Sequence, residues 1–203
     1  MSGDADEGLA SFTMNGGSLL NKNGDIFFVN NTVAAISLYD VQITNEDADG
    51  VFLRAEAAGW GNEGSNGGHV TLNASKQTID GDFLVDEVSS LNLYLSDSSL
   101  FNGSINADGE EGEVYVELDE GSTWVLSEDS YITSLTCDAD SIDLNGHKLY
   151  VNGVEYNAGE AMEGEVIEVT VSSSSSMPDM PSDGGHGPGE GGTPPEKPGD
   201  HND

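Results

Sequence analysis

The sequence predicts an all-β protein folded as a parallel β-helix, a solenoid of short strands. Up to about Ser172 the chain consists of short runs in which apolar and polar residues alternate, separated by Gly, Asn, Asp and Ser, for example ISLYDVQIT, LNLYLS and VYVELD. This alternation is typical of strands, and no helical periodicity is sustained anywhere. Similar runs open at Val70, Leu91, Val114 and Leu135, at spacings of 21, 23 and 21 residues. Such an interval is typical of a solenoid.

Each repeat is expected to form one coil. Residues 93–105 and 116–132 share one order: an alternating strand, a turn with an acid and Ser, a bulky apolar residue, a polar turn and an Ile. Coils of roughly 20 to 24 residues stack about 4.8 Å apart, so residues 12–156 have room for about six. Trp124 aligns with Leu100 of the preceding coil and is expected in the core. A sandwich of antiparallel hairpins is the alternative, but it gives no reason for the repeated interval.

The pattern divides the chain into four regions. Residues 1–10 are expected to be a leader or a truncated coil, residues 11–156 the parallel β-helix, and residues 157–171 an acidic terminal strand or cap. Residues 172–203 hold all 6 prolines, a Ser run and scattered acids. Because this last segment has almost no apolar surface to bury, it is expected to be a disordered tail rich in Ser, Gly and Pro.

Charge and composition exclude several classes of partner. The chain has 38 acidic and 5 basic residues, a formal net charge of -33. Nucleic acid is not expected as a partner and anionic membranes are poor partners, because no basic surface can neutralise phosphate. No apolar run is long enough for membrane insertion. Cys137 is the single cysteine, so there is no intrachain disulfide and no motif that needs two thiols. It is expected to be buried.

Residues 45–56, NEDADGVFLRAE, match the calcium-loop pattern at every specified position but the first, where Asn45 replaces Asp. A helix-loop-helix site is not expected, since the flanking segments read as a strand and a Gly-rich loop. A turn between strands would still place Asn45, Asp47 and Asp49 around a calcium ion, with Gly50 allowing a sharp reversal. The alternative is a solvated turn without metal.

Trp60 is the candidate carbohydrate-binding residue. It lies in a loop of Gly and Asn without apolar neighbours, where an exposed indole can stack on a sugar ring. The alternative is that it folds back as a lid over the core. No catalytic residue is assigned, because Arg54 is the only Arg and the Ser, His and acidic residues form no nucleophile motif. Catalysis is left open, and binding is favoured.

Three segments carry a family resemblance: FTMNGGS, VFLRAEAAGWGNEGSNGGHVTLNASKQTIDGDFLVD and CDADSIDLNGHKLYVNG. Over about residues 11–156 the chain resembles the C-terminal part of secreted right-handed β-helix proteins of Firmicutes that are described as carbohydrate-binding. That family is similar in fold to pectate lyases, and the resemblance implies export and binding of plant polysaccharides with calcium. Residues 121–136 also resemble autotransporter passenger coils. Because the chain opens without a signal peptide, a fragment lacking N-terminal coils is expected.

These observations predict a right-handed parallel β-helix that serves as an extracellular carbohydrate-binding or adhesive module of a bacterial surface protein. The expected partner is a polysaccharide or host glycan, and calcium is the expected cofactor. The chain is expected to be secreted or on the cell surface, as a monomer or as part of a longer chain. Two alternatives stay open: a polysaccharide lyase or hydrolase on the same fold, and a structural stalk that binds nothing.

Overall fold

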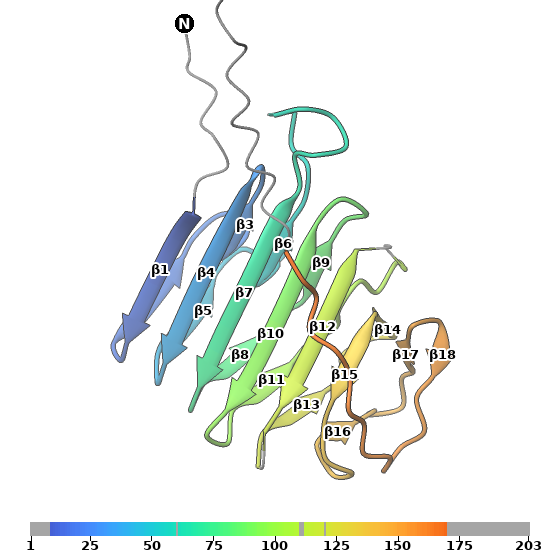
Figure 1. Cartoon of the computed structure of the whole chain (residues 1–203). Helices are drawn as coiled ribbons and strands as arrows, with labels where there is room; N and C mark the ends of the chain where they lie inside the picture. The colour runs from blue at the N-terminus through green and yellow to red at the C-terminus, as the bar shows by residue number, and fades with distance from the viewer. Residues whose placement is uncertain (1–8, 60, 110–111, 120, 170–203) are drawn as a thin grey trace, which may run out of the picture. The chain divides into compact units, whose positions relative to one another are not determined.

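The computed structural model describes residues 9–59, 61–109, 112–119 and 121–169, and these wind into stacked β coils (Figure 1). One strand of each coil joins a six-stranded sheet, the large sheet, in the order β1-β4-β7-β10-β12-β15. All neighbours in this sheet pair in parallel. Its strands are β1 (Leu9–Asn15), β4 (Thr32–Tyr39), β7 (Gly68–Ser75), β10 (Ser90–Ser96), β12 (Glu113–Leu118) and β15 (Ser134–Thr136).

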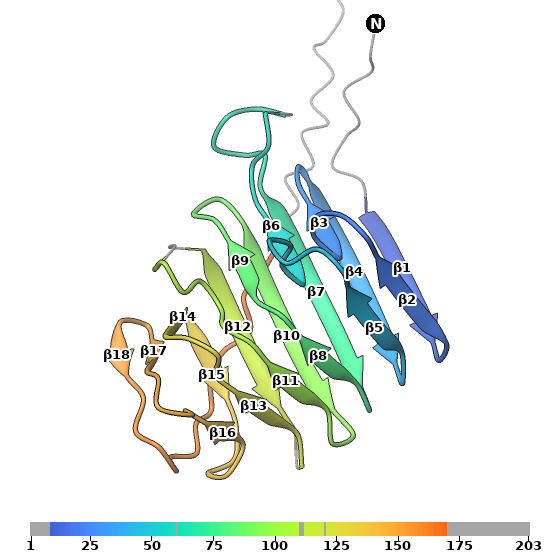
Figure 2. The same ribbon diagram turned by 180° about the vertical axis from the view of Figure 1, so that it is seen from behind.

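Shorter strands return the chain behind the large sheet (Figure 2). They form further sheets in the orders β16-β13-β11-β8, β3-β6-β9, β2-β5 and β14-β17-β18. Their bounds are β2 (Ser18–Asn21), β3 (Phe27–Val29), β5 (Gln42–Asn45), β6 (Leu53–Ala55), β8 (Thr78–Asp80), β9 (Phe83–Val85), β11 (Leu100–Asn102), β13 (Thr123–Val125), β14 (Ser130–Ile132), β16 (Ile142–Asp143), β17 (Leu149–Val151) and β18 (Val154–Glu155). The predicted parallel β-helix is therefore confirmed. Within the described residues no helix is long and apolar enough to cross a membrane.

The strand register confirms three of the four repeat positions. Leu91 pairs with Val70 in the coil before it and with Val114 in the coil after it. All three side chains are fully buried. Because parallel pairing keeps side-chain direction in phase from strand to strand, each inward residue lies on the inward residue of its neighbour.

The fourth position differs from the prediction. Leu135 was expected to lie beside Val114 of the preceding coil, but it pairs with Val116. The cause lies in one turn. In the preceding coil, residues 106–112 separate Ile105 from β12 in the sequence, whereas only Thr133 separates β14 from β15. The last coil is therefore shorter, and the register moves by two residues, which leaves Leu135 inward and fully buried.

A column of aromatic rings fills the core from coil to coil. Consecutive ring centroids from Phe27 through Phe52, Phe83 and Phe101 to Trp124 lie 5.8, 5.4, 4.8 and 5.4 Å apart. Trp124 is fully buried, as predicted, and its Nε1 donates a hydrogen bond to the Gly103 carbonyl. Its partner in the preceding coil is Phe101 rather than the predicted residue 100, because alternation turns residue 100 outward.

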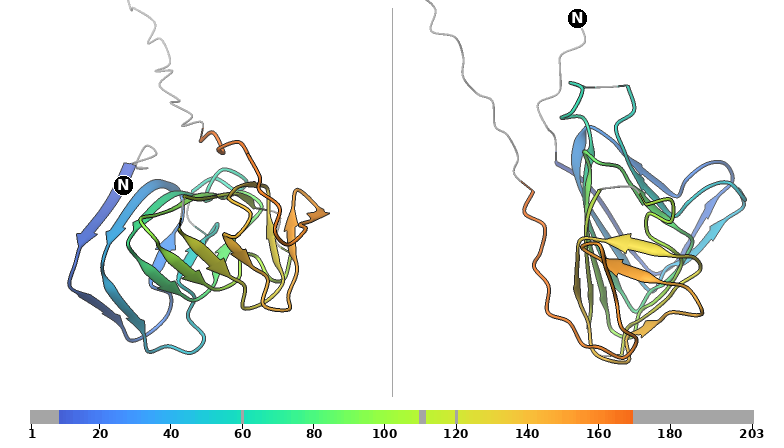
Figure 3. Two further views of the ribbon diagram at one scale, coloured as in Figure 1. Left: turned by 90° about the horizontal axis from the view of Figure 1, so that it is seen from below. Right: turned by 90° about the vertical axis from the view of Figure 1, so that its right-hand side faces the viewer.

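The two ends of the solenoid differ (Figure 3). At the C-terminal end, β17 and β18 pair antiparallel, and Cys137 exchanges two main-chain hydrogen bonds with Met162. Cys137 is buried, as predicted. At the other end, β1 is the edge of the large sheet, and Leu9 and Phe12 are 76% and 38% exposed.

After β18 the described chain forms no further strand and only one bridge, between Cys137 and Met162. From there residues 163–169, which we call the strap, run across the large sheet (Figure 1). Residues 1–8 and 170–203 lie outside the described residues, so the expected leader and disordered tail stay predictions.

Candidate binding face on the large sheet

Every second residue of the large sheet points away from the core, and parallel pairing aligns these residues in rows across the strands. We call this surface the outer face. Its rows are Leu9, Val33, His69, Ser90 and Glu113; Ser11, Ala35, Thr71, Asn92, Tyr115 and Ser134; Thr13, Ser37, Asn73, Tyr94, Glu117 and Thr136; and Asn15, Tyr39, Ser75 and Ser96.

The outer face is almost uncharged, although the chain has a net charge of -33. Among its residues only Glu113 and Glu117 are acidic, and none is Lys or Arg. Many of the acids lie instead in turns, such as Asp40 and Asp97, which have φ values of 51° and 54°. Asp tolerates this left-handed backbone better than most residues. The turns therefore carry charge, and the strands present hydroxyl and amide groups.

Three tyrosines lie among these hydroxyl and amide groups. Tyr39 is 45% exposed, and the Lys76 ammonium lies 5.8 Å from its ring centroid. Tyr94 and Tyr115 point outward and meet edge to face at 5.8 Å. The Tyr115 hydroxyl donates to Glu117, 2.6 Å away. Burial, and then the bond to Glu117, raise the pKa of Tyr115 to about 12, so this hydroxyl keeps its proton at neutral pH.

The strap binds to the outer face through its main chain. The Ile167 N–H donates to Asn92 Oδ1 at 3.0 Å, and Asn92 Nδ2 donates to the Ile167 carbonyl at 2.9 Å. The Glu165 N–H donates to Ser134 Oγ at 2.8 Å. Since Tyr115 lies between Asn92 and Ser134 in its row, the strap passes over it, and Tyr115 is only 2% exposed.

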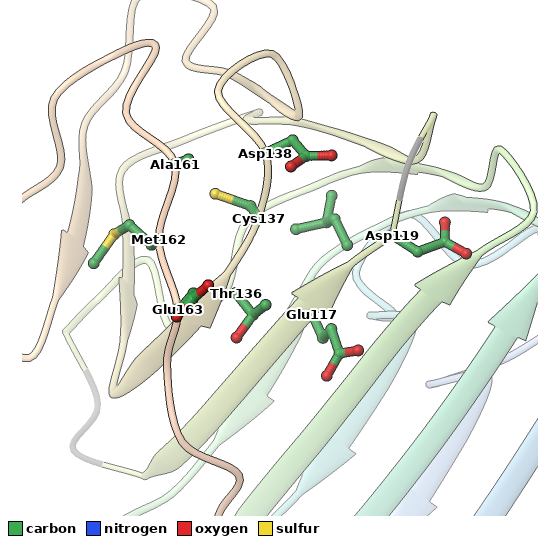
Figure 4. A pocket seen from close by; sticks show the side chains of 9 residues that line it. Glu117, Asp119, Thr136, Cys137, Asp138, Ala161, Met162 and Glu163 are labelled. Carbon is green, nitrogen blue, oxygen red and sulfur yellow. The ribbon is translucent and has the colours of Figure 1, made fainter.

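A cleft of about 490 Å³ opens where the strap begins. It lies between the ends of β12 and β15 and residues 161–163 (Figure 4). Four carboxylates line it: Glu117, Asp119, Asp138 and Glu163. Nowhere in the described part of the chain do three or more His, Cys, Asp or Glu side chains gather closely enough to hold a metal ion. The four carboxylates give the cleft a negative potential that attracts cations. They also bring the negative charge of Glu163, on the strap, close to the negative charges of the solenoid.

The structure places the predicted calcium residues in a clamp between the first two coils. Asp47 accepts the Gly24 N–H with Oδ2 at 2.6 Å and the Asp49 N–H with Oδ1 at 3.1 Å. These two bonds lower the pKa of Asp47. Asn45 Nδ2 donates to the Gly24 carbonyl at 3.1 Å. A Cβ at Gly50 would lie 2.0 Å from that same carbonyl oxygen, so close backbone approach requires glycine there.

The fit of this clamp to calcium is partial. Calcium takes roughly six to eight oxygen ligands, and Asn45, Asp47 and Asp49 supply fewer from their side chains. Main-chain carbonyls or water would have to complete the site. Glu56, the last position of the motif, lies past β6, where its carboxylate is 3.5 Å from Arg54. Calcium binding stays a prediction.

Trp60 lies outside the described residues, and its proposed sugar contact stays a prediction. Arg54 Nε donates to Asp25 at 2.6 Å, which raises the pKa of Arg54. The only Arg is therefore engaged in ion pairs and remains protonated, which makes it unsuitable as the base of a lyase.

No family model, curated protein or solved structure matches this chain. The function is therefore argued from the outer face. This face was not predicted from the sequence, although the signal was present: successive strands carry Ser, Thr, Asn or Tyr at their outward positions. Only the register aligns those positions into one surface.

Proposed function

We propose that this protein is a polysaccharide-binding module and that the outer face is its binding surface. The observation that carries the proposal is the concentration of uncharged hydroxyl and amide groups on a regular sheet of a strongly acidic chain. Parallel strands repeat these groups about every 4.8 Å. A repeating array of donors and acceptors suits an extended polymer that itself presents hydroxyl groups at regular intervals.

Charge favours a neutral glycan over a uronic acid polymer. With a net charge of -33, the protein repels polyanions at long range, and this repulsion lowers the rate of their association. Tyr39 and Tyr94 add aromatic surface for the apolar faces of sugar rings. In the wider setting of a bacterial cell surface, such a module would act in adhesion or in retention of a polysaccharide.

Binding is tested by calorimetry with neutral hexasaccharides (cellohexaose, xylohexaose and mannohexaose), with hexagalacturonate as the anionic comparison. Thr71→Glu places a charge on the part of the outer face that the strap leaves uncovered, and we expect at least a tenfold loss of affinity for the neutral ligand that binds. Thr78→Glu is the matched control, because Thr78 is exposed on β8, which belongs to another sheet of the solenoid. Equal losses in the two variants would reject the outer face as the site.

The same incubations separate binding from catalysis. A lyase would generate an unsaturated product that absorbs in the ultraviolet, and a hydrolase would generate new reducing ends. Because Arg54 is engaged by Asp25 and Glu56, we expect no unsaturated product from any of the four ligands. New reducing ends would instead assign hydrolysis by a pair of carboxylates. Failure of all four to bind would favour a structural stalk.

A further inference from the structure

We propose that the strap, residues 163–169, is a displaceable cover that occupies part of the outer face as an intramolecular ligand. This inference rests on the proposed function, because it assigns the covered strip of the outer face to the same binding surface. The strip comprises Asn92, Tyr115, Ser134 and Thr136. The strap and a glycan would then compete for it.

The contacts are those of a bound ligand rather than of a packed strand. Asn92 both accepts from and donates to the main chain of Ile167. Ser134 Oγ accepts the Glu165 N–H, and Thr136 Oγ1 accepts the Gly164 N–H at 3.0 Å. Side-chain hydroxyl and amide groups of the outer face thus satisfy an extended polar chain, as they would satisfy the hydroxyl groups of a glycan.

The strap lies over the two buried residues of the row Ser11, Ala35, Thr71, Asn92, Tyr115 and Ser134. Asn92 is 4% exposed and Tyr115 2% exposed, whereas Thr71, which pairs with Asn92 on the side away from the strap, is half-buried. Removing the strap would therefore extend the accessible outer face from β7 across β10 and β12 to β15.

Two features make the strap easy to displace. Its apolar side chains bury little: Val166 is 48% exposed, and Ile167 is half-buried. It also carries acids onto an acidic body, since Glu163 lines the same cleft as Glu117 and Asp138. Hydrogen bonds hold the strap, and their net gain is offset by the ordering of the chain and by like-charge repulsion.

Gly164 offers a substitution that loosens the strap without changing its charge. A Cβ at this position would lie 2.3 Å from Ser134 Oγ and 2.7 Å from the Leu135 nitrogen. Burial of the Leu135 side chain holds the main chain of β15 in place. The added methyl group in Gly164→Ala must therefore push the strap away from β15. Val166→Ala is the matched control, since it shortens an exposed strap side chain without a clash.

The first test needs no glycan. In the full chain, hydrogen exchange of the Glu165 and Ile167 amides should be about tenfold faster or more in Gly164→Ala than in Val166→Ala, while amides of β7 and β10 stay unchanged. Sodium chloride should slow exchange of the strap amides in the parent protein, because it screens the repulsion. If the strap amides exchange at the same rate in Gly164→Ala as in Val166→Ala, the proposal that the strap is a displaceable cover is rejected.

The second test measures competition. If the strap is closed about nine-tenths of the time, opening it raises the apparent glycan affinity about tenfold. Gly164→Ala should therefore bind the neutral hexasaccharide more tightly than Val166→Ala does, and saturating hexasaccharide should speed exchange of the Ile167 amide in the parent. Equal affinities would show that the strap and the glycan do not compete.

A third measurement separates failure of this inference from failure of the proposed function. A fluorescent peptide with the sequence of residues 163–169, EGEVIEV, should bind in trans to full-length Gly164→Ala, and the peptide with Ala in place of its Gly should not. Peptide binding without glycan binding would retain the strap site and reject the polysaccharide. No binding of the peptide would reject the strap site itself.

Discussion

Asn92 and Ile167 exchange two hydrogen bonds although they are 75 residues apart in the sequence. The side-chain amide of Asn92 thus binds the main chain of the strap in the way that a neighbouring strand would, with one donor and one acceptor. This pair joins the last described segment to the middle of the solenoid. It also marks the part of the outer face that is covered, as against the open part over β4 and β7.

The aromatic column should contribute strongly to stability. Phe83→Ala removes a fully buried ring between Phe52 and Phe101, and we expect a loss of about 3 to 5 kcal/mol in the free energy of unfolding. Phe28→Ala is the control, because Phe28 is 50% exposed. Urea denaturation of both variants measures the difference. A similar loss of unfolding free energy in the two variants would mean that the aromatic column does not stabilise the protein more than an exposed ring does.

The coils should unfold together. Val116→Asp buries an unpaired charge at a fully buried position of β12, at a cost of several kcal/mol, and each coil is the template for the next. We expect loss of β signal in circular dichroism well beyond a single coil. Asn73→Asp, at an exposed position of β7, should leave the spectrum intact. A loss confined to one coil would contradict coupling between coils.

Stability should fall at alkaline pH. Burial is the main cause that raises the pKa of Tyr115 and of Tyr156 from the ordinary value of 10.0 to about 12. A group with a raised folded pKa stabilises the protein fully below its unfolded pKa, and this contribution is lost as pH rises through the folded value. The free energy of unfolding should therefore decline between about pH 10 and pH 12 because of these groups.

The double variant Tyr115→Phe with Tyr156→Phe tests this origin, since it removes both hydroxyl groups and keeps the rings. Melting temperatures of the parent and the double variant should converge as pH rises through that window. Cys137, whose pKa burial also raises, leaves a residual decline in both proteins. Parallel curves would assign the whole decline to other groups.

Calcium should stabilise the protein if the clamp at Asn45, Asp47 and Asp49 completes a site. For a weak extracellular type of site with a Kd of about 0.1 to 1 mM, 10 mM calcium adds roughly 1.4 to 2.7 kcal/mol. Asp49→Asn is the informative variant, because the Asp47 carboxylate also holds the Gly24 N–H. We expect it to abolish the gain in thermal melts.

General screening makes the opposite prediction for the same measurement. Sodium chloride at matched ionic strength would then stabilise as much as calcium, and Asp49→Asn would respond like the parent. That outcome would remove the clamp as a metal site and would leave relief of repulsion among the carboxylates as the only effect of calcium.

The sequence by itself determined the architecture and most of the core. Alternation of apolar and polar residues reports which side chains face inward, and the recurring interval reports that the strands stack in parallel coils. Val70, Leu91 and Val114 were placed correctly for this reason, and so was the burial of Trp124. Both properties are local, or repeat along the chain, and a sequence displays them directly.

The tertiary structure decided the register and the candidate site. One short turn at Thr133 moved the partner of Leu135 from Val114 to Val116, and turn length is not visible in an alternating pattern. The register also aligned the outward Ser, Thr, Asn and Tyr residues into one face. The strap depends on contacts such as Asn92 with Ile167 and Ser134 with Glu165. No local or periodic signal specifies them, because their energy comes from segments that become neighbours only after the coils have stacked.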